Sequence, residues 1–290
     1  MRDDSSPEKR LGALNWVKTF YEVIFDMTEN GIKQERILGR NKRINILGIQ
    51  IDKLNQKETI ALVEKYVLNK EPLHLIGVNA DKINSSRKNP RLKQIVNSCG
   101  IINADGASVV LASKFLKQNL PERVAGIDLM MALVELSEKK QYSVYLLGAK
   151  KCVVEKTAKE LLKRYPRLNI VGVEDGYFKE EDWPRISEKV KHANPDFVFV
   201  GITSPIKEYL VEFLQNDGNR SIFMGVGGSF DVISGKIPRA PQWMQKTNLE
   251  WLFRVIQEPK RLFGRYFKGN SKFIGSVIRE KFSNKLEKIK

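Results

Sequence analysis

Asp105 is a first candidate for chemistry, because it follows an apolar run and precedes a helical pattern. The segment reads Asn103-Ala104-Asp105-Gly106, so it places a carboxylate at the end of an expected strand and near the amides of a helix N-terminus. A carboxylate in that position can take a proton from an attacking hydroxyl group. Asp before Gly is also common in turns and helix caps, so the residues alone leave both interpretations open.

A glycine-rich segment follows another expected strand and reads Gly225-Val226-Gly227-Gly228-Ser229-Phe230-Asp231. Glycines let backbone amides approach a diphosphate, and a helix N-terminus favours negative charge. The spacing matches neither the dinucleotide fingerprint GxGxxG nor the phosphate loop GxxxxGK[ST]. This argues against a dehydrogenase and against a P-loop nucleotide hydrolase, while a purely structural tight turn stays open.

Residues that bind metals are few in this sequence. No Asp-x-Asp triplet occurs, Cys99 and Cys152 are in no CxxC pair, and His74 and His192 are far apart. We therefore expect no zinc site, no disulfide framework and no cofactor. Without a divalent metal, a departing diphosphate needs Arg, Lys or helix N-termini to stabilise its charge.

Strand and helix patterns alternate through residues 44–248. Apolar, β-branched runs predict strands at residues 44–51, 73–79, 100–103, 143–147, 169–173, 196–202 and 221–226. Helical patterns between them cover residues 57–68, 108–116, 128–139, 153–165 and 180–192. Strands that are apolar throughout and separated by helices predict an α/β fold with a mostly parallel sheet and helices on both faces. Ligands of such folds bind at the carboxyl ends of the strands, where Asp105 and the glycine-rich segment fall.

Positive charge is the most unusual property of the composition. The 290 residues carry a formal net charge of +16, which points to nucleic acid, anionic lipid or a phosphorylated substrate as a partner. Residues 249–290 alone carry a net charge of +7, interleaved with aromatic and aliphatic side chains. That pattern is typical of a helical appendage at a membrane surface. A solvated basic tail and a nucleic-acid arm are the alternatives, but no nucleic-acid-binding motif is present, so we expect no nucleic-acid partner.

The first 43 residues form an expected N-terminal extension. Apolar residues at three- and four-residue steps predict an amphipathic helix over about residues 11–27. This helix suits packing on the main domain or on a partner chain, and also an in-plane membrane helix. No signal peptide and no stretch apolar enough to span a membrane occur. We thus expect three parts: an extension at residues 1–43, a catalytic α/β domain at residues 44–248 and a basic appendage at residues 249–290.

Several short motifs resemble the WecG/TagA/CpsF family of glycosyltransferases, which includes N-acetylmannosaminyltransferases. They are Asn79-Ala80-Asp81, Ala104-Asp105-Gly106, Pro121-Glu122-Arg123-Val124-Ala125-Gly126-Ile127-Asp128-Leu129, Tyr145-Leu146-Leu147-Gly148-Ala149, Asp175-Gly176-Tyr177-Phe178, Met224 to Asp231, Arg239-Ala240-Pro241, Leu249-Glu250-Trp251-Leu252-Phe253-Arg254 and Glu258-Pro259. The resemblance runs over about residues 44–273. It implies a Rossmann-like core whose C-terminal appendage touches the membrane.

The activity that this resemblance implies is inverting, metal-independent transfer of a sugar from a UDP-sugar to a polyprenyl-diphosphate-linked saccharide. Such transfer belongs to the synthesis of cell-surface polysaccharide or teichoic acid. The enzyme would lie peripherally on an anionic membrane surface, at the cytoplasmic face of the bacterial membrane. Members of the family are thought to self-associate, so the resemblance also implies a homo-oligomer. A non-catalytic, lipid-docked partner of a polysaccharide assembly complex is the alternative function.

The resemblance also assigns roles to individual residues. Asp105 matches the general base, and Asn79 of the neighbouring motif and Lys207 are the other expected catalytic residues. Arg123, Arg254 and Arg261 match positive positions suited to the diphosphate, although Arg123 also suits a structural ion pair and the other two suit lipid headgroups. The positions that match the nucleotide side are Gly148, Tyr177, Gly225, Gly227, Gly228 and Asp231. Asp231 suits contact with the ribose or the uracil, or capping of its own helix.

Two positions depart from the family's pattern. Gly77 stands where the family usually has Thr, and Lys207 of Pro205-Ile206-Lys207-Glu208 stands where the family usually has Gln. The departures leave the donor open between a UDP-N-acetylhexosamine such as UDP-ManNAc and a UDP-hexuronate or UDP-hexose. One hypothesis pairs Lys207 with an acidic donor sugar, for which Gly77 makes room. The other is reduced or lost activity.

Overall fold

The computed structural model describes residues 41–287, apart from the side chains of residues 246, 261–262, 265–266 and 284–287. The chain separates into two units, residues 1–42 and residues 43–290. The amphipathic helix expected over residues 11–27 lies outside the described residues. The domain boundaries expected from the sequence stay a prediction, and the following paragraphs concern the second unit.

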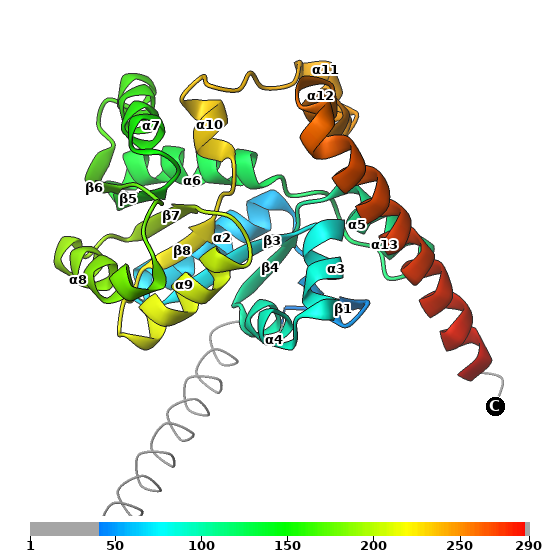
Figure 1. Ribbon diagram of the computed structural model, residues 1–290. Helices are drawn as coiled ribbons and strands as arrows, with labels where there is room; N and C mark the ends of the chain where they lie inside the picture. The colour runs from blue at the N-terminus through cyan, green and yellow to red at the C-terminus, as the bar shows by residue number, and fades with distance from the viewer. Residues whose placement is uncertain (1–40, 288–290) are drawn as a thin grey trace, which may run out of the picture. The chain divides into compact units, whose positions relative to one another are not determined.

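Six parallel strands form the central sheet of this unit, in the order β4-β3-β8-β7-β5-β6 (Figure 1). They are β3 (Leu73–Val78), β4 (Ile101–Ala104), β5 (Ser143–Gly148), β6 (Asn169–Glu174), β7 (Phe197–Gly201) and β8 (Ile222–Gly225). Consecutive residues of the inner strands are fully buried, as at Phe197, Val198, Phe199 and Val200. Successive residues of a strand point to opposite faces of the sheet, so their burial means that both faces are covered. This arrangement confirms the predicted α/β fold.

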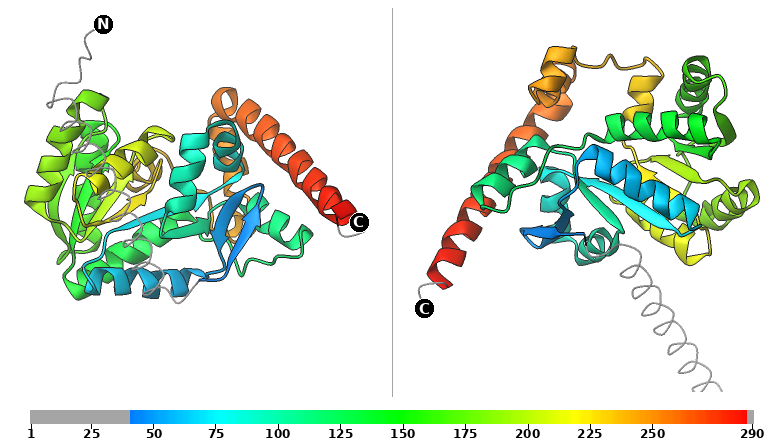
Figure 2. Two further views of the ribbon diagram at one scale, coloured as in Figure 1. Left: turned by 90° about the horizontal axis from the view of Figure 1, so that it is seen from below. Right: turned by 180° about the vertical axis from the view of Figure 1, so that it is seen from behind.

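Helices cover the two faces of the sheet. On one face lie α2 (Gln56–Leu68) and α6 (Gly126–Lys140), which Figure 2 shows from behind; on the other lie α8 (Trp183–Ala193) and α9 (Ile206–Asn216). The remaining helices of the sheet region are α3 (Ala80–Lys88), α4 (Pro90–Ser98), α5 (Ala107–Phe115), α7 (Lys151–Arg164) and the short 3-10 turn η1 (Glu180–Asp182). Residues 180–192, expected as one helix, thus divide into η1 and α8.

The prediction of one strand at residues 44–51 is wrong. The segment instead forms an antiparallel hairpin, with β1 at Arg43–Ile46 and β2 at Ile49–Asp52. Leu47 and Gly48 have φ angles of 53° and 83°, the left-handed pair that a tight two-residue hairpin turn requires. The Gly48 amide donates to the side-chain oxygen of Asn45 at 2.9 Å. The sequence Ile44-Asn45-Ile46-Leu47-Gly48-Ile49-Gln50-Ile51 looked like one mostly apolar strand, although Gly48 and the polar Asn45 that bonds it were signals of the turn.

The C-terminal part of the unit consists of helices, of which α13 packs against the α/β core. They are α10 (Ser229–Ile233), α11 (Gln242–Lys246), α12 (Glu250–Gln257) and α13 (Pro259–Glu287). Figure 1 shows α13 running beside α3 and α5, where Phe273 and Val277 are buried in the core. Over the described residues, we find no helix with the length and apolar character that crossing a bilayer requires.

Candidate active site

A large cavity of about 1560 Å³ opens at the carboxyl ends of the strands. One wall, which we call the sheet wall, consists of the segments that follow the strands. The other, the helical wall, comes from α12 and α13 and includes Glu250, Trp251, Arg254, Phe263 and Phe267. Asp105 follows the edge strand β4 and Tyr177 follows the opposite edge strand β6. Gly176, next to Tyr177, donates its amide to the Ala149 carbonyl beyond the end of β5. Four strand spacings, roughly 19 Å, separate β5 from β4, so Asp105 and Tyr177 lie towards opposite sides of the sheet wall.

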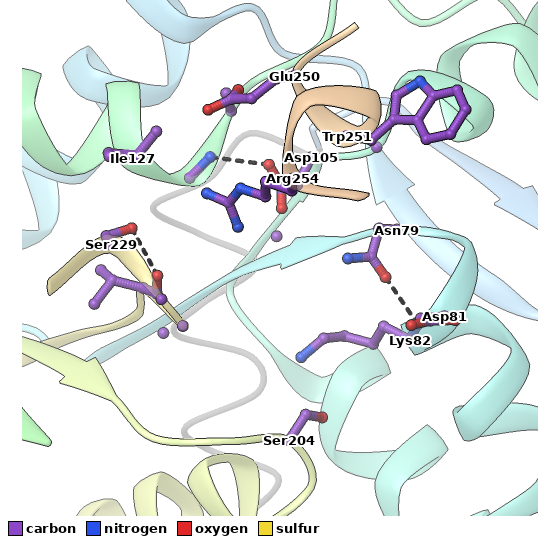
Figure 3. Close-up of a pocket in the computed structure, with 18 of the residues that line it drawn as sticks. Asn79, Asp81, Lys82, Asp105, Ile127, Ser204, Ser229, Glu250, Trp251 and Arg254 are labelled. Carbon is purple, nitrogen blue, oxygen red and sulfur yellow. Dashed lines mark hydrogen bonds between the residues drawn. The ribbon is translucent and has the colours of Figure 1, made fainter. Parts of the chain in front are cut away.

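Asp105 is held firmly at its end of the cavity. The backbone amide of Gly126, the first residue of α6, donates to Oδ1 of Asp105 at 3.0 Å (Figure 3). The Asp105 amide donates to the Val78 carbonyl at 2.9 Å, and Nε of Arg123 donates to the Asp105 carbonyl at 2.8 Å. A helix N-terminus stabilises a carboxylate. The helix in question is α6 and not α5, the helix that directly follows Asp105.

Asn79 and Gly77 lie next to Asp105 at the end of β3. Asn79 caps α3, and its side-chain oxygen accepts from the Lys82 amide at 2.9 Å, while the side chain borders the cavity (Figure 3). A Cβ on Gly77 would lie 3.0 Å from Cβ of Asp105. A side chain at this position would therefore press on Asp105, whereas glycine leaves the carboxylate uncrowded.

Lys207 belongs to a buried cluster of charged and polar groups beneath the cavity. Its Nζ lies 3.9 Å from Oε1 of Glu208, and Nζ of Lys82 donates a hydrogen bond to the same oxygen. Burial raises the pKa of Glu208, but the ammonium groups of Lys82 and Lys207 lower it more strongly, so the carboxyl is ionised. Burial lowers the pKa of His74 to about 4, so this neighbour is neutral.

The three arginines expected at the diphosphate have different surroundings. Arg123 forms an ion pair with Glu250 at 3.3 Å, which agrees with the structural alternative. Arg254 belongs to α12 and borders the cavity close to Asp105 (Figure 3). The ion pair between Arg123 and Glu250 connects the first residue of α12 to the segment that follows Asp105. No ion pair of Arg254 is seen within residues 41–287. Arg261 belongs to α13, and its side chain lies outside the described part of the chain.

The residues expected at the nucleotide gather towards the other end of the cavity. Gly225, Gly227 and Gly228 line it, and Gly227 has a φ angle of 52° that favours glycine. Asp231 forms an ion pair with Lys236 at 2.6 Å. This hydrogen bond raises the pKa of Lys236, to which the nearby Tyr177 also contributes. Tyr177 lines the cavity and is 72% exposed, so its ring is available to a ligand.

Gly148 does not line the cavity, unlike the other nucleotide-side residues. Its φ angle is 131°, and a Cβ there would lie 2.6 Å from the carbonyl carbon of Gly201. The next residue, Ala149, borders the cavity, and its amide donates to the Gly201 carbonyl at 3.0 Å. Gly148 thus permits the close approach of the ends of β5 and β7, and its predicted contact with the nucleotide stays untested.

Three charged residues at the site were not singled out from the sequence. Glu250 is buried between Arg123 and Arg239, and Lys82 and Glu208 form the buried pair beneath the cavity. Glu208 and Glu250 belong to quoted motifs, which was the signal available for them. Lys82 had none. No cluster of three or more His, Cys, Asp or Glu side chains suited to a metal is found over residues 41–287.

Comparison with known proteins shows the family to which the chain belongs. The profile described as "Glycosyl transferase WecG/TagA/CpsF family" matches residues 44–287. A protein of Bacillus subtilis (strain 168) is 33% identical over 208 residues, which cover 71% of this chain and 80% of the relative. A protein of Staphylococcus aureus (strain MW2) is 31% identical over 222 residues, covering 76% and 87% respectively. Both are named N-acetylglucosaminyldiphosphoundecaprenol N-acetyl-beta-D-mannosaminyltransferase.

Proposed function

The chain belongs to the WecG/TagA/CpsF glycosyltransferase family, and on that premise we propose that it moves a sugar from a UDP-sugar to a polyprenyl-diphosphate-linked saccharide. The relatives' names state an acceptor of this class, N-acetylglucosaminyldiphosphoundecaprenol. The observation that carries the proposal is the Asp105 carboxylate, fixed by the Gly126 amide at one end of a cavity that also holds the glycine-rich turn.

Asp105 acts as the general base in this proposal. The Gly126 amide donates to Oδ1, so Oδ2 is the oxygen that accepts the proton of the acceptor hydroxyl. As the proton moves, the hydroxyl oxygen of the acceptor attacks the anomeric carbon of the donor sugar. The new carbon–oxygen bond forms on the face opposite the diphosphate, while the bond to the diphosphate oxygen breaks and UDP leaves. This displacement inverts the anomeric configuration. The proton stays on Asp105 until solvent takes it.

The departing diphosphate gains negative charge and needs stabilisation. Arg254 and the amides of the turn at Gly225, Gly227 and Gly228 border the space between Asp105 and Tyr177. We place the diphosphate against these groups, with the nucleoside towards Tyr177 and Asp231. An arginine can bind two phosphate oxygens at once, which is charge stabilisation that needs no metal.

The exposed face of α13 is the proposed membrane contact. An apolar stripe runs along it, which we call the α13 stripe: Phe263, Phe267, Ile274, Ile278 and Phe282, each 42–66% exposed. Exposed bases accompany the stripe at Lys260, Lys268, Lys272 and Arg279. Such a face suits peripheral binding to anionic lipid, at the cytoplasmic side where UDP-sugars are made. Phe263, Phe267 and Ile274 also line the cavity, so a lipid-linked acceptor can reach Asp105 along α13.

A UDP-release assay tests the proposal. The protein is mixed with a short-chain polyprenyl-diphosphate-GlcNAc acceptor and a panel of UDP-sugars, with EDTA in one series and Mg²⁺ in another. We expect one donor to be turned over equally in both series, and nuclear magnetic resonance of the product to show an inverted anomeric centre. Retained configuration would contradict the mechanism. UDP binding without turnover of any donor would favour the non-catalytic, lipid-docked alternative.

A further inference from the structure

Lys207 occupies a confined position on the floor of the cavity. It is the second residue of α9, and its side chain is 12% exposed. The side chain packs on Gly225 at the end of β8, where an added Cβ would lie 3.0 Å from Cε of Lys207. Glycine at this point lets the lysine lie flat against the strand end. The ammonium group therefore faces the cavity where the sheet wall meets the glycine-rich turn.

The protein leaves the Lys207 ammonium without a full partner. The nearest carboxylate is Glu208, but Oε1 of Glu208 accepts a hydrogen bond from Lys82. Lys207 lies 3.9 Å from that oxygen, beyond hydrogen-bond distance. Within the part of the chain that the structure describes, no hydrogen bond donated by Lys207 is found. An ammonium has three donors, and a charge this well buried is costly unless an anion pairs with it.

The charges around Lys207 leave room for one more anion. Lys82 and Lys207 bring two positive charges and Glu208 one negative charge, while His74 is neutral because burial lowers its pKa to about 4. Asp105 is the other carboxylate that acts on Lys207, but within residues 41–287 the two side chains form no ion pair, and Oδ1 of Asp105 accepts from the Gly126 amide instead. Burial and the repulsion of Lys82 lower the pKa of Lys207 to about 8, so it is mostly protonated at neutral pH.

We propose that Lys207 is a specificity-determining residue that selects donors whose sugar carries a carboxylate, the class of UDP-hexuronates. This inference rests on the proposed function. In an in-line displacement the sugar ring lies between the attacking hydroxyl at Asp105 and the diphosphate at the glycine-rich turn. Lys207 borders that interval, packed on Gly225 and within electrostatic reach of Asp105. In the proposed function the diphosphate is bound by Arg254 and the backbone amides of the glycine-rich turn. The Lys207 ammonium is therefore available to bind the sugar.

Equilibrium binding of matched donors tests this inference. Each pair differs only by a hydroxymethyl group or a carboxylate at C6: UDP-glucose with UDP-glucuronate, and UDP-N-acetylmannosamine with its C6 carboxylate. We expect the protein to bind the carboxylate member of at least one pair about tenfold more tightly. Lys207→Gln should remove this preference, and Lys207→Arg should keep most of it. The Kd for UDP alone should change less than about twofold in each variant.

Lys150→Gln is the matched control, because Lys150 also lines the cavity but is exposed; it should keep the preference. Equal binding of both members of every pair by the unmodified protein would overturn the inference while leaving the proposed function intact. An equal loss of affinity for UDP in Lys207→Gln would also overturn it, since Lys207 would then bind the diphosphate. Failure of the unmodified protein to bind UDP or any UDP-sugar would count against the proposed function itself.

Discussion

The two walls of the cavity are built differently. On the sheet wall, Asp105 is fixed by two hydrogen bonds: the Gly126 amide donates to its side chain, and the Arg123 side chain donates to its backbone carbonyl. On the helical wall, α12 is joined to the core through Glu250, and α13 presents exposed aromatic residues such as Phe267, which is 66% exposed. The difference indicates a division of labour. In the proposed function, the sheet wall holds the reacting groups in place before substrate arrives, and the helical wall meets the lipid that carries the acceptor.

Substituting the α13 stripe should give the largest effect on membrane binding. Ile278→Ser with Phe282→Ser removes two large apolar side chains of the stripe that do not line the cavity, each worth about 2 kcal/mol when buried. We expect affinity for vesicles containing anionic lipid to fall at least about 100-fold, as measured by sedimentation. Turnover of a short-chain, water-soluble acceptor should persist.

Trp243→Ser is the control for this change, because Trp243 is also exposed but lies in α11, outside the stripe. Its vesicle affinity should match that of the unmodified protein. Equal weakening by both changes would show that the α13 stripe has no special part in membrane contact.

Glu250→Gln should loosen the joint between the two walls. Glu250 is buried and pairs with Arg123 at 3.3 Å and with Arg239 at 3.7 Å. Removing one partner of a buried ion pair leaves uncompensated charge, so the free energy of unfolding should fall by about 3 kcal/mol. Urea denaturation measures this change. The exposed pair of Glu135 with Lys139 provides the comparison: Glu135→Gln should leave stability unchanged, and a similar loss there would remove the distinction.

Tyr177→Ala tests the other end of the sheet wall, where the tyrosine side chain is largely exposed. An aromatic ring that stacks on a base contributes about 1–3 kcal/mol. We expect the Kd for UDP to rise about tenfold while kcat at saturating donor changes little. Tyr177→Phe should bind UDP as the unmodified protein does. A loss of kcat without a change in Kd would place Tyr177 at the reacting centre instead.

The smallest effect concerns pH. Burial lowers the pKa of Lys207 from its ordinary range to about 8, so the ammonium is present below that pH and lost above it. Preference for a carboxylate-bearing donor should therefore be full near pH 7 and decline several-fold by about pH 9 or above. The decline comes above about pH 8 because a bound carboxylate itself raises the pKa of Lys207. Titrating matched donors across this range checks the sign; a preference that grew with pH would contradict it.

Free lysine in the unfolded chain keeps its proton to a higher pH than folded Lys207. Between about pH 8 and the ordinary lysine range, the unfolded state thus binds more protons than the folded state. This group alone makes the protein more stable as pH rises through that window. In Lys207→Gln that contribution to the pH dependence of unfolding should disappear.

Local sequence patterns predicted the sheet well and the site in part. The mostly apolar runs at β3, β5, β7 and β8 are buried on both faces, so they were easy to detect in the sequence. Asp105 fell correctly at a strand end, because the strand and the following helix were both evident. The hairpin at Leu47 and Gly48 was missed, since its two central turn residues are not polar and four isoleucines at residues 44, 46, 49 and 51 suggested one strand.

Contacts between distant residues were beyond such patterns. Arg123 and Glu250 are 127 positions apart, and Lys82 and Glu208 are 126 apart. Polar residues on α3 gave no sign of burial, because the cover over Lys82 comes from other parts of the chain. Likewise, the close approach of Gly148 to Gly201 could not be foreseen from the sequence, while its contact with the nucleotide stays a prediction.

The central claim is that Asp105 on the sheet wall takes the proton of the acceptor. Its most direct test compares Asp105→Asn with Asp231→Asn at saturating donor and acceptor, measuring kcat by UDP release and the Kd for UDP by calorimetry. We predict that Asp105→Asn lowers kcat by about 10²–10⁴ with its Kd for UDP unchanged, whereas Asp231→Asn weakens UDP binding and keeps most of kcat. An Asp105→Asn enzyme that retained more than about a tenth of kcat would contradict the account.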